Sequence, residues 1–196
     1  MTKINNYFKQ SSDLILSLKS YNSELNLFVK KILDVKKNGK KILVAGNGGS
    51  CSDAEHFVGE LQCTFKSRDR EPISAFSITG STAALTAWSN DFEYNSFFER
   101  QVQAHGQKGD VLVLLTTSGG QLNGSSSNVV KAAIAANKLN IPVISFVGRT
   151  GGELKKLSEI CFHIENNVTS FIQEAHMSLL HCVCELLEDE LKLSKS

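Results

Sequence analysis

Proline and tryptophan are almost missing from this sequence, with two prolines and one tryptophan in 196 residues. Proline breaks helices and strands, so its scarcity beside 14 glycines favours long regular elements joined by glycine turns. No apolar run reaches the ~18 residues that a membrane helix needs. The N-terminal MTKINNYFKQSSDL also lacks the apolar segment of a secretory signal. We therefore expect no membrane partner and no export.

An excess of either charge is lacking too. Lysine and arginine total 21 and aspartate and glutamate 20, which gives a formal net charge of +1. A dedicated nucleic-acid binder carries a clear basic excess, so we expect no nucleic-acid partner. The five cysteines follow no regular spacing, and Cys182 and Cys184 do not match a zinc-knuckle pattern. Reduced thiols in a cytoplasmic protein explain them most simply.

Short apolar runs alternate with helical patterns from residue 41 onward. The runs are KILVA (41–45), ISAFSI (73–78), VLVLLT (111–116), PVISFV (142–147) and ICFHI (160–164). Helices are expected at about 50–66, 80–104, 125–139, 150–157 and 169–192. This alternation predicts an α/β fold, a three-layer αβα sandwich around five parallel strands. Such sheets bind ligands at the carboxyl ends of their strands, at a topological switch point.

The first 38 residues are expected to form two helices. Leu25, Phe28 and Ile32 recur at helical spacing, and an apolar face of this kind needs a surface to cover, in its own domain or on a partner subunit. We predict an N-terminal helical oligomerisation arm over 1–38 and a ligand-binding domain over 39–196. We also predict a homotetramer with the N-terminal helices, through that apolar face, and the last helix at its centre.

Two loops have the composition of phosphate-binding loops. The first, Gly46-Asn47-Gly48-Gly49-Ser50, combines glycines that admit an anion close to the backbone with the N-terminus of the next helix. Ser50 is expected to cap that helix, with Asp53 completing a capping-box-like arrangement. A tight turn with ordinary capping is the alternative. The pattern is neither GxGxxG nor a Walker A loop, which disfavours a dinucleotide site.

The second loop, Thr116-Thr117-Ser118-Gly119-Gly120, follows the third strand and continues as QLNGSSSNVVKA. Hydroxyls and backbone amides bind phosphate without lysine, and neither loop contains a basic residue. The alternative is a flexible serine–glycine loop. Two such loops after neighbouring strands favour the phosphate interpretation.

Two helices carry candidate chemistry. His56 and Glu60 are four residues apart, on one helix face, which suits a metal pair, a base beside an orienting group, or an ordinary surface contact. Gln173 and His181 on the last helix are separated by a rise of about 12 Å and cannot lie side by side. They would reach one ligand from above and below, or serve sites of different subunits, unless His181 is a core histidine.

Taken together, AGNGGS…DAEHF…EL, SNDF, TTSG…SSNVVKA and FIQEAH…LLH resemble the sugar isomerase (SIS) family and, more closely, its phosphoheptose isomerases. The resemblance runs from about residue 4 to 192. It implies the SIS fold, a tetramer, and an aldose–ketose isomerase that converts sedoheptulose 7-phosphate into D-glycero-D-manno-heptose 7-phosphate through a cis-enediol. The product would supply lipopolysaccharide or another glycan.

The resemblance also implies the site. One Zn²⁺ per subunit would be held by His56, Glu60, Gln173 and His181, with Glu60 as the base at carbon and His181 as the acid/base partner at oxygen. A glutamine amide is a weak zinc ligand, and a weakly held metal can exchange a ligand for substrate oxygens. The expected substrate contacts are Asn47, Gly48, Gly49, Ser50, Glu60, Asn90, Asp91, Thr116, Thr117, Ser118, Ser126 and Gln173. Glu174 and His176 are expected on the helix surface or in an interface.

The sequence departs from the family in three places. About four extra residues around Gln121–Gly124 leave open which of the three serines 125–127 contacts phosphate. Ser170 and Phe171 stand where the family has an aspartate and an arginine, and the Thr64 region stands where it has an arginine. Because these positions lie near the sugar, a different phosphosugar stays open as the substrate.

Two rival functions share the fold. A non-catalytic SIS regulator that binds the replication initiator DnaA typically lacks the residues matching Glu60 and His181, both of which are present. A phosphosugar sensor in a transcription factor carries a DNA-binding domain, for which the first 38 residues are too short and too weakly basic. The sequence therefore favours the enzyme.

Overall fold

Five apolar segments pair into one parallel sheet with the strand order β2-β1-β3-β4-β5. The computed structural model describes residues 2–193. The strands are β1 (Ile42–Gly46), β2 (Ala75–Ser77), β3 (Val111–Thr116), β4 (Val143–Gly148) and β5 (Ile160–Ile164). The predicted five-stranded parallel α/β fold is confirmed.

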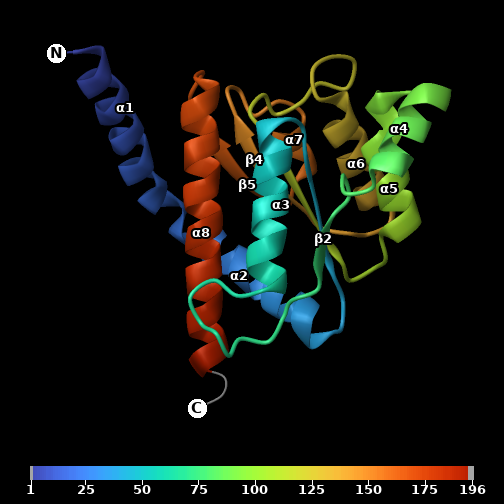
Figure 1. Ribbon diagram of the computed structural model, residues 1–196, viewed down its shortest axis with the longest axis horizontal. Coiled ribbons are helices and arrows are strands. Elements are labelled where there is room, and N and C mark those ends of the chain that lie inside the picture. Colours follow the sequence, from blue (N-terminus) through green and yellow to red (C-terminus); the bar gives the residue numbers. More distant parts are fainter. Residues whose placement is uncertain (1, 194–196) are drawn as a thin grey trace.

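Helical layers cover both faces of the sheet (Figure 1). One layer contains α2 (Asn22–Lys37), α3 (Gly49–Gln62) and α8 (Thr169–Leu193), and the other α4 (Thr82–Asp91), α5 (Phe97–His105), α6 (Ser127–Lys138) and α7 (Leu154–Leu157). Neighbouring strand residues serve opposite cores: Val44 faces the first layer and Leu43 the second. Every residue of β1, β3 and β4 is buried, which explains their near-continuous apolar sequences.

The apolar face of α2 belongs to the core of its own domain. Leu25 is 7% exposed, and Phe28 and Ile32 are fully buried. The ring of Phe28 lies about 6 Å from those of Phe57 on α3 and Phe146 on β4. The expectation that this face joins subunits is therefore wrong. Helical periodicity shows that a face is buried but does not show which surface buries it.

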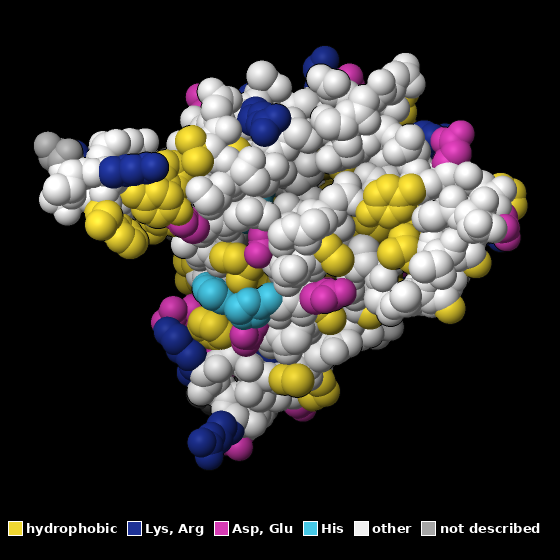
Figure 2. All heavy atoms as spheres, turned by 45° about the horizontal axis from the view of Figure 1, so that its top comes forward, with side chains coloured by type: hydrophobic (Ala, Val, Ile, Leu, Met, Phe, Trp, Pro, Cys, Tyr) yellow, Lys and Arg dark blue, Asp and Glu magenta, His cyan; other side chains and the backbone are white. Residues whose placement is uncertain are grey.

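Only α1 (Lys3–Ser17) stands away from the body (Figure 1), and none of its residues is buried. It is joined to α2 by the short 3-10 turn η1 (Leu18–Tyr21). Tyr7 fixes it to α8, because its ring packs 4.8 Å from that of Phe171 and its hydroxyl donates to Glu174. Its exposed apolar side chains include Ile4, Phe8 and Leu16. Figure 2 shows hydrophobic side chains gathered on this projecting helix. Of the two predicted N-terminal helices, α1 is thus the one with an uncovered apolar surface.

The sequence predicts one helical stretch over about 80–104, but the structure has two helices there. α4 ends at Asp91, and the 3-10 turn η2 (Tyr94–Ser96) leads into α5. Trp88 stabilises the break, because its ring stacks on Phe92 and its indole N–H donates to Ser96. None of the residues of α4 is buried, so packing does not enforce a longer helix there.

None of the helices within residues 2–193 is long and apolar enough to cross a membrane.

Candidate active site

The two predicted phosphate loops meet at the centre of the sheet. β1 lies between β2 and β3, and Gly46 at its carboxyl end pairs with Leu115 near the end of β3. The chain leaves β1 for α3 on one face and leaves β3 for α6 on the other. This is a topological switch point, where the divergent loops leave a crevice for a ligand.

The hydroxyls of the second loop converge on one another. Thr116 Oγ1 lies 3.1 Å from Ser118 Oγ and 3.3 Å from Ser126 Oγ. Ser126 occupies the N-cap position of α6 with a left-handed backbone, φ 55°. Ser127 is buried. The structure therefore places Ser126 beside the other hydroxyls, and its contact with phosphate stays a prediction.

The insertion at 121–124 folds outward. Gln121 N–H donates to the carbonyl of Ser125, and Gly124 N–H donates to the carbonyl of Gln121. Leu122 at its tip is 44% exposed. The extra residues form a closed turn that returns the chain to Ser126, so the hydroxyl cluster survives the insertion.

A third segment, which the sequence analysis did not single out, supports this loop. The N–H groups of Glu153 and Leu154 donate to the carbonyls of Gly120 and Gly119. Gly119 has a φ of +79°, and a Cβ there would collide with the backbone of Gly151. The Gly-Gly pair at 151–152 was the signal in the sequence for this close approach.

The first loop starts its helix earlier than predicted. Gly48, with a φ of +55°, is the N-cap of α3, and Ser50 is a buried residue inside the helix. The predicted cap by Ser50 is therefore wrong, because the left-handed turn at Gly48 lets the helix begin two residues earlier than a cap at Ser50 would. Asp53 makes no capping bond either: its Oδ2 is shielded from solvent without a partner. Burial raises the pKa of Asp53 to about 6, although nearby His56 acts in the opposite direction.

Three of the candidate chemical groups come together between α3 and α8. His56 Nε2 lies 3.1 Å from Glu60 Oε1 and 3.4 Å from His181 Nε2. The two imidazole rings meet edge to face, and the ring of Phe65 stacks on His181. Figure 2 shows histidine side chains touching on this face with acidic groups around them. We call His56, Glu60 and His181 the acid–base cluster.

Gln173 lies apart from this cluster, at the glycine loop. A Cβ on Gly49 would collide with the side-chain amide of Gln173. α8 thus places Gln173 beside the first loop and His181 beside His56, two helical turns further along. The structure brings together three of the four residues expected around zinc, and the fourth faces the loops.

The donor chemistry of this region fits zinc. Two imidazole nitrogens, a carboxylate and an amide oxygen are ligand types that zinc accepts, the amide being the weakest. Within residues 2–193, however, no group of three or more histidine, cysteine, aspartate or glutamate side chains is arranged to hold a metal ion. The cluster distances are those of hydrogen bonds.

Asn90 and Asp91 form the last turn of α4 and are exposed. Asn90 Nδ2 donates to Asp91 Oδ1 at 2.8 Å. The structure places neither residue directly against the two loops. The connection runs through Tyr94, three residues after Asp91, whose hydroxyl donates to Asn47.

From the sequence we expect His176 on the helix surface or in an interface. In the structure it is fully buried within its own domain. Its ring packs edge to face on that of Phe146, and neither ring nitrogen has a hydrogen-bond partner. Burial lowers the pKa of His176 to about 4, so the ring is neutral at pH 7. It lies on the sheet side of α8, whereas His181 faces α3. Glu174 is held by α1.

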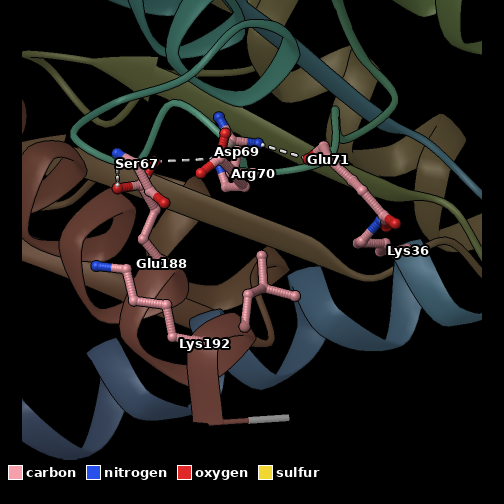
Figure 3. A pocket seen from close by; sticks show the side chains of 8 residues that line it. Lys36, Ser67, Asp69, Arg70, Glu71, Glu188 and Lys192 are labelled. Carbon is pink, nitrogen blue, oxygen red and sulfur yellow. Dashed lines mark hydrogen bonds and ion pairs between the residues drawn. The ribbon is translucent and has the colours of Figure 1, made fainter. Parts of the chain in front are cut away.

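A separate hollow lies near the carboxyl end of α8 (Figure 3). Its lining residues are Lys36, Ser67, Asp69, Arg70, Glu71, Glu188, Leu191 and Lys192. Arg70 pairs with Glu188 at 3.1 Å, both side chains being buried, and donates to carbonyls at the end of α3, among them that of Leu61. Burial opposes ionisation of Glu188, but hydrogen bonds from the 65–67 backbone and from Arg70 hold its pKa below the usual value. This pair anchors the 63–72 loop to α8.

Comparisons with known proteins identify the relatives of this chain. The SIS domain family matches residues 6–148. The chain is 41% identical to a phosphoheptose isomerase of Helicobacter pylori over 88% of this chain and 86% of that protein. It is 36% identical to a phosphoheptose isomerase of Aquifex aeolicus over 96% of each. The structure of phosphoheptose isomerase from Neisseria gonorrhoeae superimposes with a TM-score of 0.86 at 31% identity, covering 95% of this chain and 97% of that one.

Proposed function

The chain belongs to the phosphoheptose isomerases of the SIS family, and from this membership we propose that it converts sedoheptulose 7-phosphate into D-glycero-D-manno-heptose 7-phosphate through a cis-enediol. The observation that carries the proposal is the approach of His181, His56 and Glu60 to one another, with His56 and Glu60 on the helix that begins at the first of two loops suited to phosphate. An isomerase of this kind needs an anchor for the phosphate and two groups that move protons.

The loops supply the anchor. The amides of 47–50 and the hydroxyls of Thr116, Thr117, Ser118 and Ser126 would hold the phosphate at the N-termini of α3 and α6. Neither 46–50 nor 116–126 contains a lysine or arginine. The charge of the phosphate is thus met by neutral donors and by the positive ends of two helix dipoles.

The acid–base cluster supplies proton transfer. Glu60 would take the proton from the carbon next to the carbonyl and return it to the neighbouring carbon, while His181 exchanges a proton with the sugar oxygens. The Glu60 side chain is 22% exposed, so solvent can reach it. His56 lies between the two, and its Nε2 is within hydrogen-bond distance of Glu60 Oε1 and of His181 Nε2.

We also propose that Zn²⁺ is held by His56, Glu60, Gln173 and His181. A bound zinc ion supplies a positive charge that stabilises a developing enediolate. Metal analysis of the purified protein tests this directly: about one zinc per chain is expected, and a metal-free preparation with full turnover would exclude it.

The reaction itself is tested in D₂O. Proton transfer through an enediol to a carboxylate that exchanges with solvent is expected to place deuterium on the sugar carbon. Product formation without deuterium would indicate transfer shielded from solvent. A lack of turnover with any C5 to C7 ketose phosphate would overturn the proposal, and turnover of another sugar alone would change only the substrate.

Two residues near the expected sugar site, Ser170 and Phe171, differ from the family pattern. Phe171 is 4% exposed beneath Tyr7, and Ser170 Oγ lies 3.5 Å from the Tyr7 hydroxyl. At the two positions where the family has an aspartate and an arginine, Ser170 and Phe171 therefore bind α1. Replacing those two charged residues would favour a sugar whose hydroxyls differ in position or orientation near these residues.

We further propose a cytoplasmic homotetramer that feeds heptose into lipopolysaccharide or another glycan. The exposed apolar side of α1 supports the assembly, because surfaces of this kind mark interfaces. Sedimentation of the protein and of Phe8→Glu, with Lys9→Glu as the control, tests it. We expect the first substitution alone to dissociate the oligomer, and a monomeric wild-type protein would refute the assembly.

A further inference from the structure

One residue of the first loop, Asn47, joins three segments of the site. Its side-chain amide pairs with that of Asn128 through two hydrogen bonds of 2.9 Å. Its Oδ1 also accepts a 2.6 Å hydrogen bond from the Tyr94 hydroxyl. Asn128 is 2% exposed in the first turn of α6, directly after the serines of the second loop, and Tyr94 follows the Asn90-Asp91 corner.

A backbone donor fixes the orientation of this network. The N–H of Val129 can only donate; it lies 3.0 Å from Asn128 Oδ1 and 3.2 Å from the carbonyl oxygen of Ser126, and a flipped Asn128 amide would set two N–H groups against each other. The Nδ2 of Asn128 must therefore point toward Asn47, where it donates to Asn47 Oδ1. The Asn47 oxygen then has to accept from Tyr94 as well, and the three side chains admit only this arrangement.

This arrangement leaves the Asn47 side chain with one unused hydrogen-bonding group. Both lone pairs of its Oδ1 are used, by Asn128 and Tyr94, and one of its two Nδ2 hydrogens is donated to Asn128. The remaining N–H is a donor. The Asn47 side chain can therefore donate to a ligand oxygen but cannot accept from a ligand hydroxyl.

We propose that Tyr94 and Asn128 are positioning residues that hold Asn47 as a single hydrogen-bond donor to the sugar phosphate. The inference rests on the proposed function for the nature of the ligand. It assigns Asn47 to a carbonyl, phosphate or other oxygen that accepts. It also makes Tyr94 the link by which the Asn90-Asp91 corner and the two loops keep their relative places.

The test is a double-mutant cycle. Tyr94→Phe removes one hydroxyl and is expected to lower kcat/KM about tenfold, the scale of one hydrogen bond, chiefly through KM. If Tyr94 acts through Asn47, then Tyr94→Phe added to Asn47→Ala changes kcat/KM by less than about twofold. Asn128→Ala is the second arm of the cycle and is likewise expected to add nothing to Asn47→Ala. Fully additive effects in both arms would overturn the proposal.

Controls separate this role from a structural one. Tyr21→Phe removes a hydroxyl that donates to the carbonyl of His163, away from both loops, and should leave KM unchanged. Inorganic phosphate should still raise the melting temperature of Tyr94→Phe, because the second loop is intact. The rise should equal that of the wild type where Asn47 donates to a sugar oxygen, and be smaller where it donates to the phosphate. An equal loss in Tyr21→Phe, or complete loss of the phosphate effect, would mean a structural role and refute the proposal.

The cycle is measured by turnover and by calorimetric binding of sedoheptulose 7-phosphate. A chain that binds the sugar without turning it over overturns the proposed function, while the binding cycle still decides whether Tyr94 and Asn128 act through Asn47. A chain that turns the sugar over but shows additive losses keeps the function and overturns this inference. Absence of binding overturns both.

Discussion

The hydroxyl cluster of the second loop and the acid–base cluster are built in opposite ways. Thr116, Ser118 and Ser126 lie within eleven residues of one another and carry no charge. His56 and His181 are 125 residues apart, ionisable, and meet only because α8 packs along α3. The first cluster suits an anion whose charge is constant during the reaction, and the second suits protons that move.

This difference predicts separable losses. Changes in the hydroxyl cluster should weaken binding of ground state and transition state alike, whereas changes in the acid–base cluster should act on the transition state alone. Substitutions in each cluster test that division.

Glu60→Gln should lower turnover by at least ~10²-fold, the scale of a lost general base. The amide is nearly isosteric but cannot accept the proton, so folding and phosphate binding should remain. Steady-state kinetics and phosphate-dependent melting measure both. Glu190→Gln, an exposed change on α8, is the control, and near-normal turnover in Glu60→Gln would remove Glu60 from the chemistry.

We expect His176 to set how the free energy of unfolding depends on pH, whereas His181 acts in turnover. Its pKa is lowered to about 4 in the folded protein, from 6.5, so the unfolded chain binds the extra proton between these values. Stability is therefore full above pH 6.5 and falls as the pH drops toward 4, by a total on the order of 3 kcal/mol at ~1.4 kcal/mol per pKa unit. Urea unfolding at about pH 7.5 and 5.5 measures the slope.

His176→Leu is the matched variant. It should keep turnover and lose this slope. The raised pKa of Asp53 has the opposite sign, since protonation near pH 6 favours the folded state. Its contribution is smaller because solvent reaches the rest of the residue, although Oδ2 is shielded. If His176→Leu lost as much stability at acid pH as the wild type, a group other than His176 would cause the effect.

Ser118→Ala should weaken binding by about 1.5–3 kcal/mol, the value of a hydrogen bond to a charged group, or roughly 10- to 150-fold in KM. Turnover at saturation should change little, because the phosphate is bound alike in both states. Kinetics on the phosphorylated sugar decide this. If turnover collapsed while KM stayed constant, Ser118 would belong to the chemistry and the division would fail.

Leu122→Ser should have the smallest effect, within about twofold in kcat and KM, as for most surface substitutions. The side chain lies at the tip of the outward turn of the insertion. A large change in KM in the same kinetic assay would instead show that the insertion reaches the sugar.

The sequence by itself determined the sheet, the glycine loops and the candidate chemical groups. Continuous apolar runs require burial on both faces, and glycine at a strand end requires a close backbone approach, so both signals are local. The resemblance to known isomerases added the grouping of His56, Glu60, Gln173 and His181. The predictions that failed depended on packing or on a single backbone conformation. They are the subunit-joining face of α2, one helix over 80–104, a surface position for His176, and the cap at Ser50, where the left-handed residue Gly48 starts the helix earlier.

Only the tertiary structure decided which surface each apolar face covers and which distant side chains meet. The periodicity of α2 is the same whether its partner is its own sheet or another subunit, and His176 and His181 are both histidines of one helix. Their different surroundings arise because α8 packs on the sheet with one side and along its neighbour α3 with another. The Asn47–Asn128–Tyr94 network likewise joins residues up to 81 positions apart, and hydrogen bonds over such separations leave no periodic signal in a sequence.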